Sequence, residues 1–388
     1  MNRTFGCVRV VWNRTLAERQ RRWRQARQGT GYAETDRALT AMKRDPELGW
    51  LNEVSCVPLQ QALRHQRAAF QAFFGNRARY PRFKSRHAHQ SAHYTRSAFC
   101  LREGALRLAK TSGPLAFVWS WPDVDVTALN PTMVIVSREP DGRWYVTFAV
   151  DGDALEPLVA TGRAAGVDLG IEDFAVISAG EKIANPRHLD RRARNLARYQ
   201  RRLARCQHGS ANRAKAKVAR AHRKVRNARQ DFLHRASTHL VRSNDLIAIE
   251  DLAVRNMIRN RHLARAISDC GWAEFRRQLE YKCQRYGRRL IVIDRWYPSS
   301  KTCSDCGFLL AGLPLGVRTW RCPSCGTRQD RDINAAKNIL AAGLAVARSP
   351  GDACGADVRH SGTSRVQSAA KQETQPARAG IPVLQGGQ

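Results

Sequence analysis

The chain has 388 residues, 43% of them hydrophobic, and its 66 Lys and Arg against 33 Asp and Glu give a formal net charge of +33. That length can supply two or three compact domains, and so large a charge favours a polyanionic partner, above all nucleic acid. The sequence contains no run near the roughly 18 apolar residues that a membrane helix needs, and seven of its 11 cysteines are scattered singly. We therefore expect a cytoplasmic protein rather than a membrane-spanning or disulfide-rich secreted one.

The N-terminal part alternates apolar and basic segments. Residues 8–12 (VRVVW) predict a strand, and residues 13–27 predict a strongly basic helix suited to phosphate contacts. A second helix is expected to open at Pro58, with an apolar stripe that indicates a core rather than a cofactor site. The stripe comprises Leu59, Leu63, Phe70 and Phe73.

The stretch 77–86 (RARYPRFKSR) interleaves Tyr80 and Phe83 with five basic residues, among them Lys84. This combination can hold phosphates while a ring stacks on a base, although a solvated loop would look the same. Between about 100 and 160 the pattern turns to β structure. Residues 133–137 and 144–150 predict a hairpin in a small barrel or sheet.

Four short apolar runs in the second half carry acids at or near their ends, and they predict buried strands of one mixed sheet. They are GVDLG (166–170), FAVIS (174–178), LIAIED (246–251) and LIVID (290–294). Asp168 lies inside the first run, Glu250 ends the third, and Asp332 starts the helix-like segment DINAAKNIL. Each acid alone is more often structural, and Asp332 could be a helix N-cap. Together they could hold two divalent metal ions, and hard carboxylate oxygens favour Mg²⁺ or Mn²⁺ over zinc.

The most basic segment, 187–229, has 16 Lys and Arg and a single acid, Asp190. Two heptad series with a break at 208–210 (HGS) predict a helical hairpin over 187–232 with a thin apolar seam. The series are Leu189, Leu196 and Leu203, then Val218, Val225 and Phe232. Such a run is often a solvated face, but this one would repel itself without a polyanion, so we expect nucleic-acid contacts. The candidates are Arg191, Arg194, Arg198 and Arg202.

A metal site is predicted by the pairs Cys303-x2-Cys306 and Cys322-x2-Cys325, which a 15-residue spacer separates. Four thiolates at this spacing form a closed tetrahedral zinc site with no position left for substrate, so the zinc is expected to be structural.

The order of motifs in the second half resembles a known family. GVDLG, LIAIEDLAVRNM, SDCGWAEFRRQLEYKCQRYG, SSKTCSDCG and CPSCGTRQDRDINAAKNIL resemble the TnpB (OrfB) proteins of bacterial insertion sequences, relatives of type V CRISPR effectors. The resemblance covers 164–344 and extends weakly to 80–84 (YPRFK) and 371–373 (KQE).

This resemblance implies an RNA-guided DNA endonuclease whose guide RNA, transcribed from the end of the element, pairs with the target strand. It implies a RuvC triad of Asp168, Glu250 and Asp332 that binds Mg²⁺ or Mn²⁺, and a zinc-binding segment at the four cysteines. The partners would be guide RNA and double-stranded DNA, bound by a monomer at the nucleoid. The alternatives are a transposase-like or junction-resolving nuclease that acts without guide RNA, and a nucleic-acid-binding regulator.

The implied fold is an α/β RNase H-like (RuvC) nuclease domain with a zinc ribbon insertion, joined to an N-terminal oligonucleotide-binding-like β-barrel with a helical insert. That insert would read a short motif beside the target, with Tyr80, Phe83 and Lys84 as candidates. The expected boundaries are 1–12 and 100–162 for the barrel, 13–99 for the helical insert, 163–299 and 329–345 for the nuclease domain, 300–328 for the ribbon, and 346–388 for a disordered tail.

Overall fold

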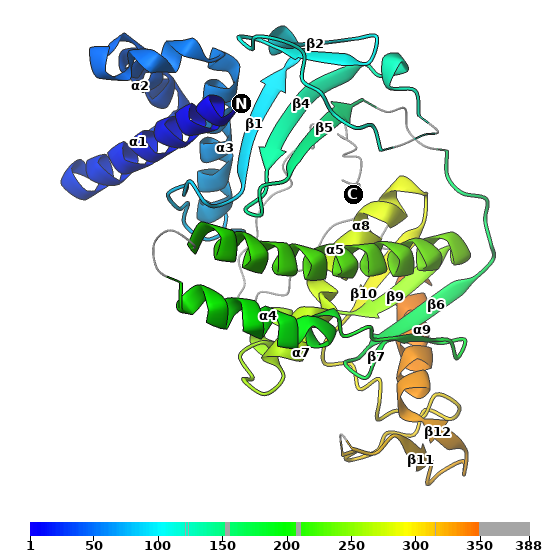
Figure 1. Cartoon of the computed structure of the whole chain (residues 1–388). Coiled ribbons are helices and arrows are strands. Elements are labelled where there is room, and N and C mark those ends of the chain that lie inside the picture. The colour runs from blue at the N-terminus through cyan, green and yellow to red at the C-terminus, as the bar shows by residue number, and fades with distance from the viewer. Residues whose placement is uncertain (121, 123, 152–155, 207–210, 315, 349–388) are drawn as a thin grey trace. The chain divides into compact units, whose positions relative to one another are not determined.

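The computed structural model describes residues 1–348, apart from 121, 123, 152–155, 207–210 and 315 (Figure 1). Its contacts divide the chain into two compact units. The first contains Met1–Gly152 and Cys206–Arg220, and the second contains Asp153–Arg205 and Ala221–Glu373. Within the described residues, no helix is both long and apolar enough to cross a membrane.

The helices of the first unit pack around a core that includes Cys7, Val11, Leu51 and Leu63. They are α1 (Asn2–Ala26), α2 (Tyr32–Arg44), the 3-10 helix η1 (Pro46–Glu53) and α3 (Cys56–Phe74).

Helix α1 runs through residues 8–12, so the predicted strand there is wrong, whereas the basic helix that was predicted next is confirmed. Cys7, Val8, Val11 and Trp12 are all buried. Their spacing of three and four places them on one helical face, and packing of that face overrides the β preference of the valines.

Helix α3 starts at Cys56, two residues before the predicted opening at Pro58, and its N-cap is the Ser55 hydroxyl, which accepts a hydrogen bond from Val57 N. Three members of the predicted stripe are buried, which confirms its role in the core: Leu59, Leu63 and Phe70. The fourth, Phe73, is half-buried.

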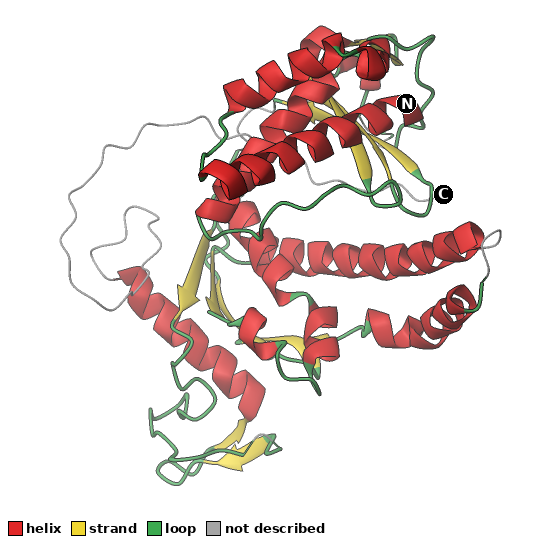
Figure 2. Cartoon of the chain, turned by 90° about the vertical axis from the view of Figure 1, so that its left-hand side faces the viewer, coloured by secondary structure: helices red, strands yellow, loops and turns green. Residues whose placement is uncertain are grey.

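The described strands of the first unit form two antiparallel sheets, which Figure 2 shows in yellow. One has the order β1-β4-β5, and the other pairs β2 with β3. The strands are β1 (Gln90–Thr95), β2 (Phe99–Arg102), β3 (Ala105–Leu108), β4 (Pro131–Arg138) and β5 (Trp144–Val150), with short 3-10 helices η2 (Arg96–Ala98) and η3 (Val126–Ala128). Strands β4 and β5 confirm the predicted hairpin. Strand β1 lies inside 13–99, so that range is not wholly helical, and residues 2–12 belong to α1 rather than to a sheet.

The second unit is built on a five-stranded mixed sheet of order β10-β9-β6-β7-β8. Strands β6, β7 and β8 are antiparallel neighbours, whereas β9 is parallel to both β6 and β10. The bounds are β6 (Ala164–Leu169), β7 (Asp173–Ile177), β8 (Lys182–Ala184), β9 (Leu246–Glu250) and β10 (Arg289–Ile293). The four predicted strands of one mixed sheet are confirmed, and β8 is an addition.

The remaining elements are α4 (His188–Ala204), α5 (Ala211–Ser243), α6 (Val254–Met257), α7 (Ala264–Cys270), α8 (Trp272–Arg285), β11 (Thr319–Arg321), β12 (Arg328–Asp330) and α9 (Arg331–Arg348). Helices α4 and α5 confirm that both halves of the basic segment are helical, with Leu196 and Val225 buried. The predicted break at 208–210 lies outside the described residues. Residues 346–348 end α9, so the predicted tail begins too early, and the rest of it lies outside the described residues.

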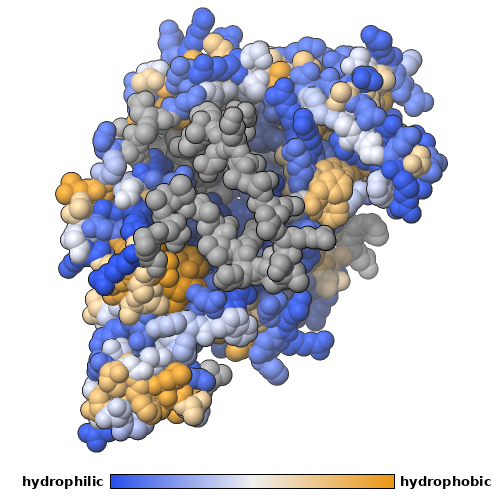
Figure 3. All heavy atoms as spheres, turned by 180° about the vertical axis from the view of Figure 1, so that it is seen from behind, coloured by the Kyte–Doolittle hydropathy of each residue, from blue (hydrophilic) through white to orange (hydrophobic). Residues whose placement is uncertain are grey.

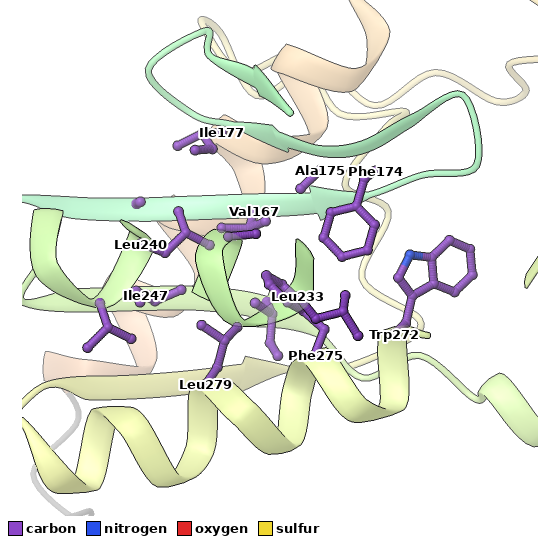
Figure 4. Close-up of a cluster of buried hydrophobic side chains, with 14 of the residues drawn as sticks. Val167, Phe174, Ala175, Ile177, Leu233, Leu240, Ile247, Trp272, Phe275 and Leu279 are labelled. Atoms are coloured by element: carbon purple, nitrogen blue, oxygen red, sulfur yellow. The ribbon is translucent and has the colours of Figure 1, made fainter. Parts of the chain in front are cut away.

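Two helix layers cover the central strands on opposite faces. Figure 4 shows Val167 and Ile247 on the face that packs against Leu233 and Leu240 of α5 and Leu279 of α8. Because side chains alternate along a strand, the next residues face the other way, and Ala248 packs with α9.

Helix α9 crosses strand β6 at Gly166, at a distance that only glycine permits. A Cβ atom at Gly166 would lie 2.1 Å from the Ala336 carbonyl oxygen and 2.5 Å from Leu340 N. The close crossing fixes the first turns of α9 over the end of β6.

Candidate active site

Two of the predicted acids end neighbouring parallel strands. Strands β6 and β9 pair Gly166 with Ala248 and Val167 with Ile249, so Asp168 and Glu250 follow at the same level. Each acid lies two residues after a residue that faces α9, and both therefore share that face of the sheet.

The third acid comes from the first turn of α9. Asp332 lies one helical turn before Ala336, the residue that meets Gly166, so it is positioned above the continuation of β6 towards Asp168. It is not the helix cap, because Asp330 Oδ1 accepts hydrogen bonds from Asp332 N at 3.0 Å and Ile333 N at 3.1 Å. The nearest cation is Arg318, whose Nη1 lies 3.4 Å from Asp332 Oδ2.

The three carboxylates influence one another electrostatically. Burial raises the pKa of Asp168 to about 7, and the negative charges of Glu250 and Asp332 contribute to that rise. Burial also raises the pKa of Glu250, against the hydrogen bond from Ser299. Clustered, half-buried acids of this kind are costly unless a cation joins them, and their oxygen-only donor set fits Mg²⁺ or Mn²⁺.

The neighbouring acid Asp251 differs because it already has two cationic partners. Arg276 Nη1 lies 2.6 Å from Asp251 Oδ1, and Arg295 pairs with the other oxygen. Burial alone would raise the pKa of Asp251, but the hydrogen bonds from these two arginines outweigh burial and hold the pKa below its usual value. Glu250 rather than Asp251 therefore belongs with Asp168 and Asp332.

A residue that the sequence reasoning missed, Ser299, holds Glu250 in place. Its buried hydroxyl donates a hydrogen bond to Glu250 Oε1. Its carbonyl oxygen accepts a hydrogen bond from Asn338 Nδ2 of α9 at 2.7 Å. Ser299 thus links Glu250 to the helix that carries Asp332.

Two asparagines of α9, also missed, tie the same loop to the helix. Asn334 and Asn338 are buried, lie one turn apart, and both donate to the Thr302 carbonyl, at 2.7 and 2.6 Å. Asn334 Oδ1 also accepts a hydrogen bond from Ser304 N at 2.8 Å. A signal was present in the sequence, since two amides four residues apart on the apolar side of a helix require buried partners.

The four predicted cysteines come together in the ribbon formed by β11 and β12. Their sulfur atoms all lie within 4.8 Å of one another, with Cys303 and Cys325 3.7 Å apart and Cys306 and Cys322 3.6 Å apart. Zn–S bonds of about 2.3 Å in a tetrahedron place sulfurs about 3.8 Å apart, so the cluster fits zinc.

Each cysteine pair sits on the same kind of tight turn. Gly307 N donates to the Cys303 carbonyl and Gly326 N to the Cys322 carbonyl, both at 2.9 Å, and both glycines have positive φ, +77° and +75°. Figure 3 shows apolar residues (orange) on the surface of the ribbon at the lower left, where Phe308 and Leu309 are exposed.

The aromatic and basic candidates of the first unit differ in exposure. Tyr80 packs edge-on against Phe70 and Phe73, and Lys84 Nζ lies 4.4 Å from the centroid of the Trp12 ring. Phe83 is 53% exposed, although its neighbours are anchored to α1: Trp12 Nε1 donates to the Arg82 carbonyl, and Asn13 exchanges two hydrogen bonds with Lys84. A fixed backbone thus presents the Phe83 ring to solvent.

The arginine candidates of α4 share one exposed face. Arg191, Arg194, Arg198 and Arg202 are spaced three or four residues apart and are all exposed, whereas Leu196 on the opposite face is buried. The helix is anchored by Asp269, which accepts from Leu189 N at 2.8 Å and from Arg229 at 2.7 Å.

Three families match parts of the chain. Residues 136–261 match OrfB_IS605, described as a probable transposase, and residues 272–339 match the Cas12f1-like TNB domain. Residues 1–28 match a helix-turn-helix domain, although α1 occupies this range as one helix.

Similar proteins cover nearly the whole chain. A Streptomyces pristinaespiralis protein is 51% identical over 99% of this chain and 94% of its own length, and InsQ of Escherichia coli K12 is 30% identical over 89% of each. Both are named, provisionally, RNA-guided DNA endonucleases. A Cas12f1 chain solved by cryo-electron microscopy with single-guide RNA and target DNA is similar in fold, with a TM-score of 0.55, 14% identity, and coverage of 87% of this chain and 81% of that chain.

Proposed function

The chain belongs to the TnpB family, and we propose that it is an RNA-guided DNA endonuclease of a transposable element, with Asp168, Glu250 and Asp332 as the catalytic carboxylates. The observation that carries this proposal is the meeting of three uncapped, unevenly buried acids at one edge of the sheet in a chain of net charge +33.

The three acids would hold Mg²⁺ or Mn²⁺ through their oxygens, and two such ions supply an activated water and stabilise the leaving oxygen of the phosphodiester. Ser299 keeps one oxygen of Glu250 engaged and so orients the other. Asp251, bound to Arg276 and Arg295, supports the positive rim beside the acids without joining them.

The nuclease domain that we propose is RNase H-like, comprising 163–299 and 329–345, with a zinc ribbon at 300–328. Three antiparallel strands followed by two parallel ones, with the acids at the ends of the first and fourth, support it. We propose that the first unit, with strands from about 90 onwards and helices before them, contains the barrel-like domain and its helical insert. Tyr80, Phe83 and Lys84 remain candidates for reading a short motif beside the target.

The proposed partners are a guide RNA and double-stranded DNA, bound by a monomer in the cytoplasm at the nucleoid. A transposase-like nuclease without guide RNA is the alternative, and the description of the OrfB_IS605 family favours considering it. Purification from cells that carry the element's ends tests the two. Co-purification of one defined RNA, and cleavage that follows a change of its guide sequence, are expected. Unguided cleavage by RNA-free protein would support the alternative.

Ser299→Ala is expected to weaken binding of Mn²⁺ and to lower cleavage about tenfold, because Glu250 loses a hydrogen bond to a charged group worth about 1.5–3 kcal/mol. Calorimetric titration of Mn²⁺ and the metal dependence of the cleavage rate measure this. Ser299→Thr, which keeps a hydroxyl, should recover most of the affinity, and Ser300→Ala is the neighbouring control. Equal Mn²⁺ affinity in Ser299→Ala and the wild type would remove the positioning role.

Replacing Arg191, Arg194, Arg198 and Arg202 together by Gln is expected to weaken nucleic-acid binding for all sequences, because these side chains would meet phosphates. The slope of log K against log salt should fall by up to about 0.9 for each duplex phosphate that is no longer neutralised, or about 0.7 on a single strand. Target choice should not change. The matched control replaces the same four residues by Lys, which keeps the charge and most of the slope. An unchanged slope in the Gln variant would mean that α4 is only a solvated helix.

A further inference from the structure

A recess of about 540 Å³ opens beside Glu250 in the second unit. Its apolar wall is formed by residues that follow β9 and by the start of α8, including Leu252, Val254, Trp272 and Ala273. This volume lies within the range of small-molecule sites, and the catalytic acid forms part of the lining.

The polar part of the lining is mainly cationic. Arg255, Arg276, Arg277 and Arg295 line the recess, against the acids Glu250 and Glu280. Asp251 orients two of these arginines, Arg276 and Arg295. An apolar wall beside a row of guanidinium groups suits a ligand with a flat ring and a phosphate, which is the composition of a nucleotide.

A tryptophan follows directly after the recess. Trp296 is 85% exposed, which is unusual for so large an apolar ring. Its backbone is fixed, since Trp296 N donates to Asp294 Oδ1 at 2.7 Å and Ser299 N donates to the Tyr297 carbonyl at 2.8 Å. This turn joins Arg295 of the recess to Ser299, the partner of Glu250, so the indole stands on a fixed turn at the edge of the acid cluster.

We propose that the recess and Trp296 bind an unpaired segment of the strand to be cut, next to the scissile phosphate. One base enters the recess against Ala273 and Leu252, Arg276 and Arg295 contact the backbone phosphates, and Trp296 stacks on a neighbouring base. The occupant is single-stranded because a base can stack on a side chain only when its face is free. The proposal rests on the proposed function, since it assigns to the acids the phosphate beside that base.

The experiment uses the complete complex of protein, guide RNA and target DNA, with a single abasic nucleotide moved along the strand that is cut. In the wild type, an abasic site at one position beside the cut should slow cleavage about tenfold, since stacking of one base contributes about 1–3 kcal/mol. Ala273→Trp, which fills the recess from an exposed helix position, should lose a similar factor on intact DNA and no further factor on the abasic strand. Ala273→Ser is the matched control and should behave as the wild type.

A second measurement does not require cleavage. In the complex of the Asp168→Ala variant, 2-aminopurine in the strand beside the cut should be quenched by stacking. The quenching should be lost in Trp296→Ala and kept in Trp296→Phe.

Wild-type cleavage that is insensitive to every abasic position, together with unchanged quenching in Trp296→Ala, would overturn the subsite. Failure of the proposed function would look different, because then the wild type would not cut intact DNA at all.

Discussion

Single replacement of Asp168, Glu250 or Asp332 by Ala is expected to lower the cleavage rate by about a thousandfold or more while binding of guide RNA and target DNA is kept. Metal ions contribute several kcal/mol to stabilising the charge of the transition state, and about 4 kcal/mol corresponds to that factor. Binding should survive because the acids face one another and α9 rather than forming the basic surfaces.

The control for these variants is Asp251→Ala, an acid next to Glu250 whose charge is already compensated by Arg276 and Arg295. It should keep cleavage within about tenfold of the wild type, since it removes an orienting partner and no proposed metal ligand. Rates under single turnover and Mn²⁺ titration measure both effects. Near-normal cleavage by any one triad variant would exclude that residue from the triad.

The strands that carry the acids could be predicted because a continuous apolar run that ends in an acid has few alternatives in a folded chain. The runs around Asp168 and before Glu250 became β6 and β9 of one sheet. Strand β8 could not be predicted, since three residues, Lys182–Ala184, with one partly buried isoleucine carry no pattern. It exists through its pairing with β7.

The run VRVVW illustrates the opposite case, in which a local pattern predicted the wrong element. Its valines favour a strand in isolation, yet Cys7, Val11 and the residues around them face the core formed with α3. A window of five residues cannot reveal a helix of 25 residues, because the buried positions that define its period extend from Thr4 to Leu16.

The candidate site was foreseen in its ligand types but not in its supports. Acids and cysteines are chemically conspicuous, whereas Ser299 is one of many serines, and its role depends on a contact across 49 residues with Glu250. The capping role could not be assigned to Asp330 rather than Asp332 from the sequence, because both precede the same apolar helix and only the backbone shows which carboxylate meets the free N–H groups.

Cys303→Ser or Cys322→Ser is expected to lose zinc, unfold the ribbon and reduce cleavage to background. The apparent free energy of zinc binding to a four-ligand site is about 10–16 kcal/mol, which a ribbon of two three-residue strands, β11 and β12, cannot replace by packing. Metal analysis of the wild type should find one zinc per chain.

The loss should reach the acids because both ends of the ribbon are attached to them. Ser299, at the start, holds Glu250, and the loop up to Ser304 is held by Asn334 of α9. At the other end, Gln329 of β12 donates to Cys303 Sγ at 3.4 Å and lies three residues before Asp332. Released from the cysteines, both connections would relax, and the distance between Glu250 and Asp332 would no longer be fixed.

Cys100→Ser is the control, since this exposed cysteine lies in β2, outside the four-cysteine cluster, and its replacement should keep both zinc and cleavage. Mn²⁺ affinity separates the two parts of the argument. If the ribbon positions the acids, Cys303→Ser should weaken Mn²⁺ binding, as Ser299→Ala does, and cleavage and Mn²⁺ affinity should fall together. A folded, zinc-free protein that cuts DNA at the wild-type rate would show that the ribbon neither needs the metal nor positions the acids.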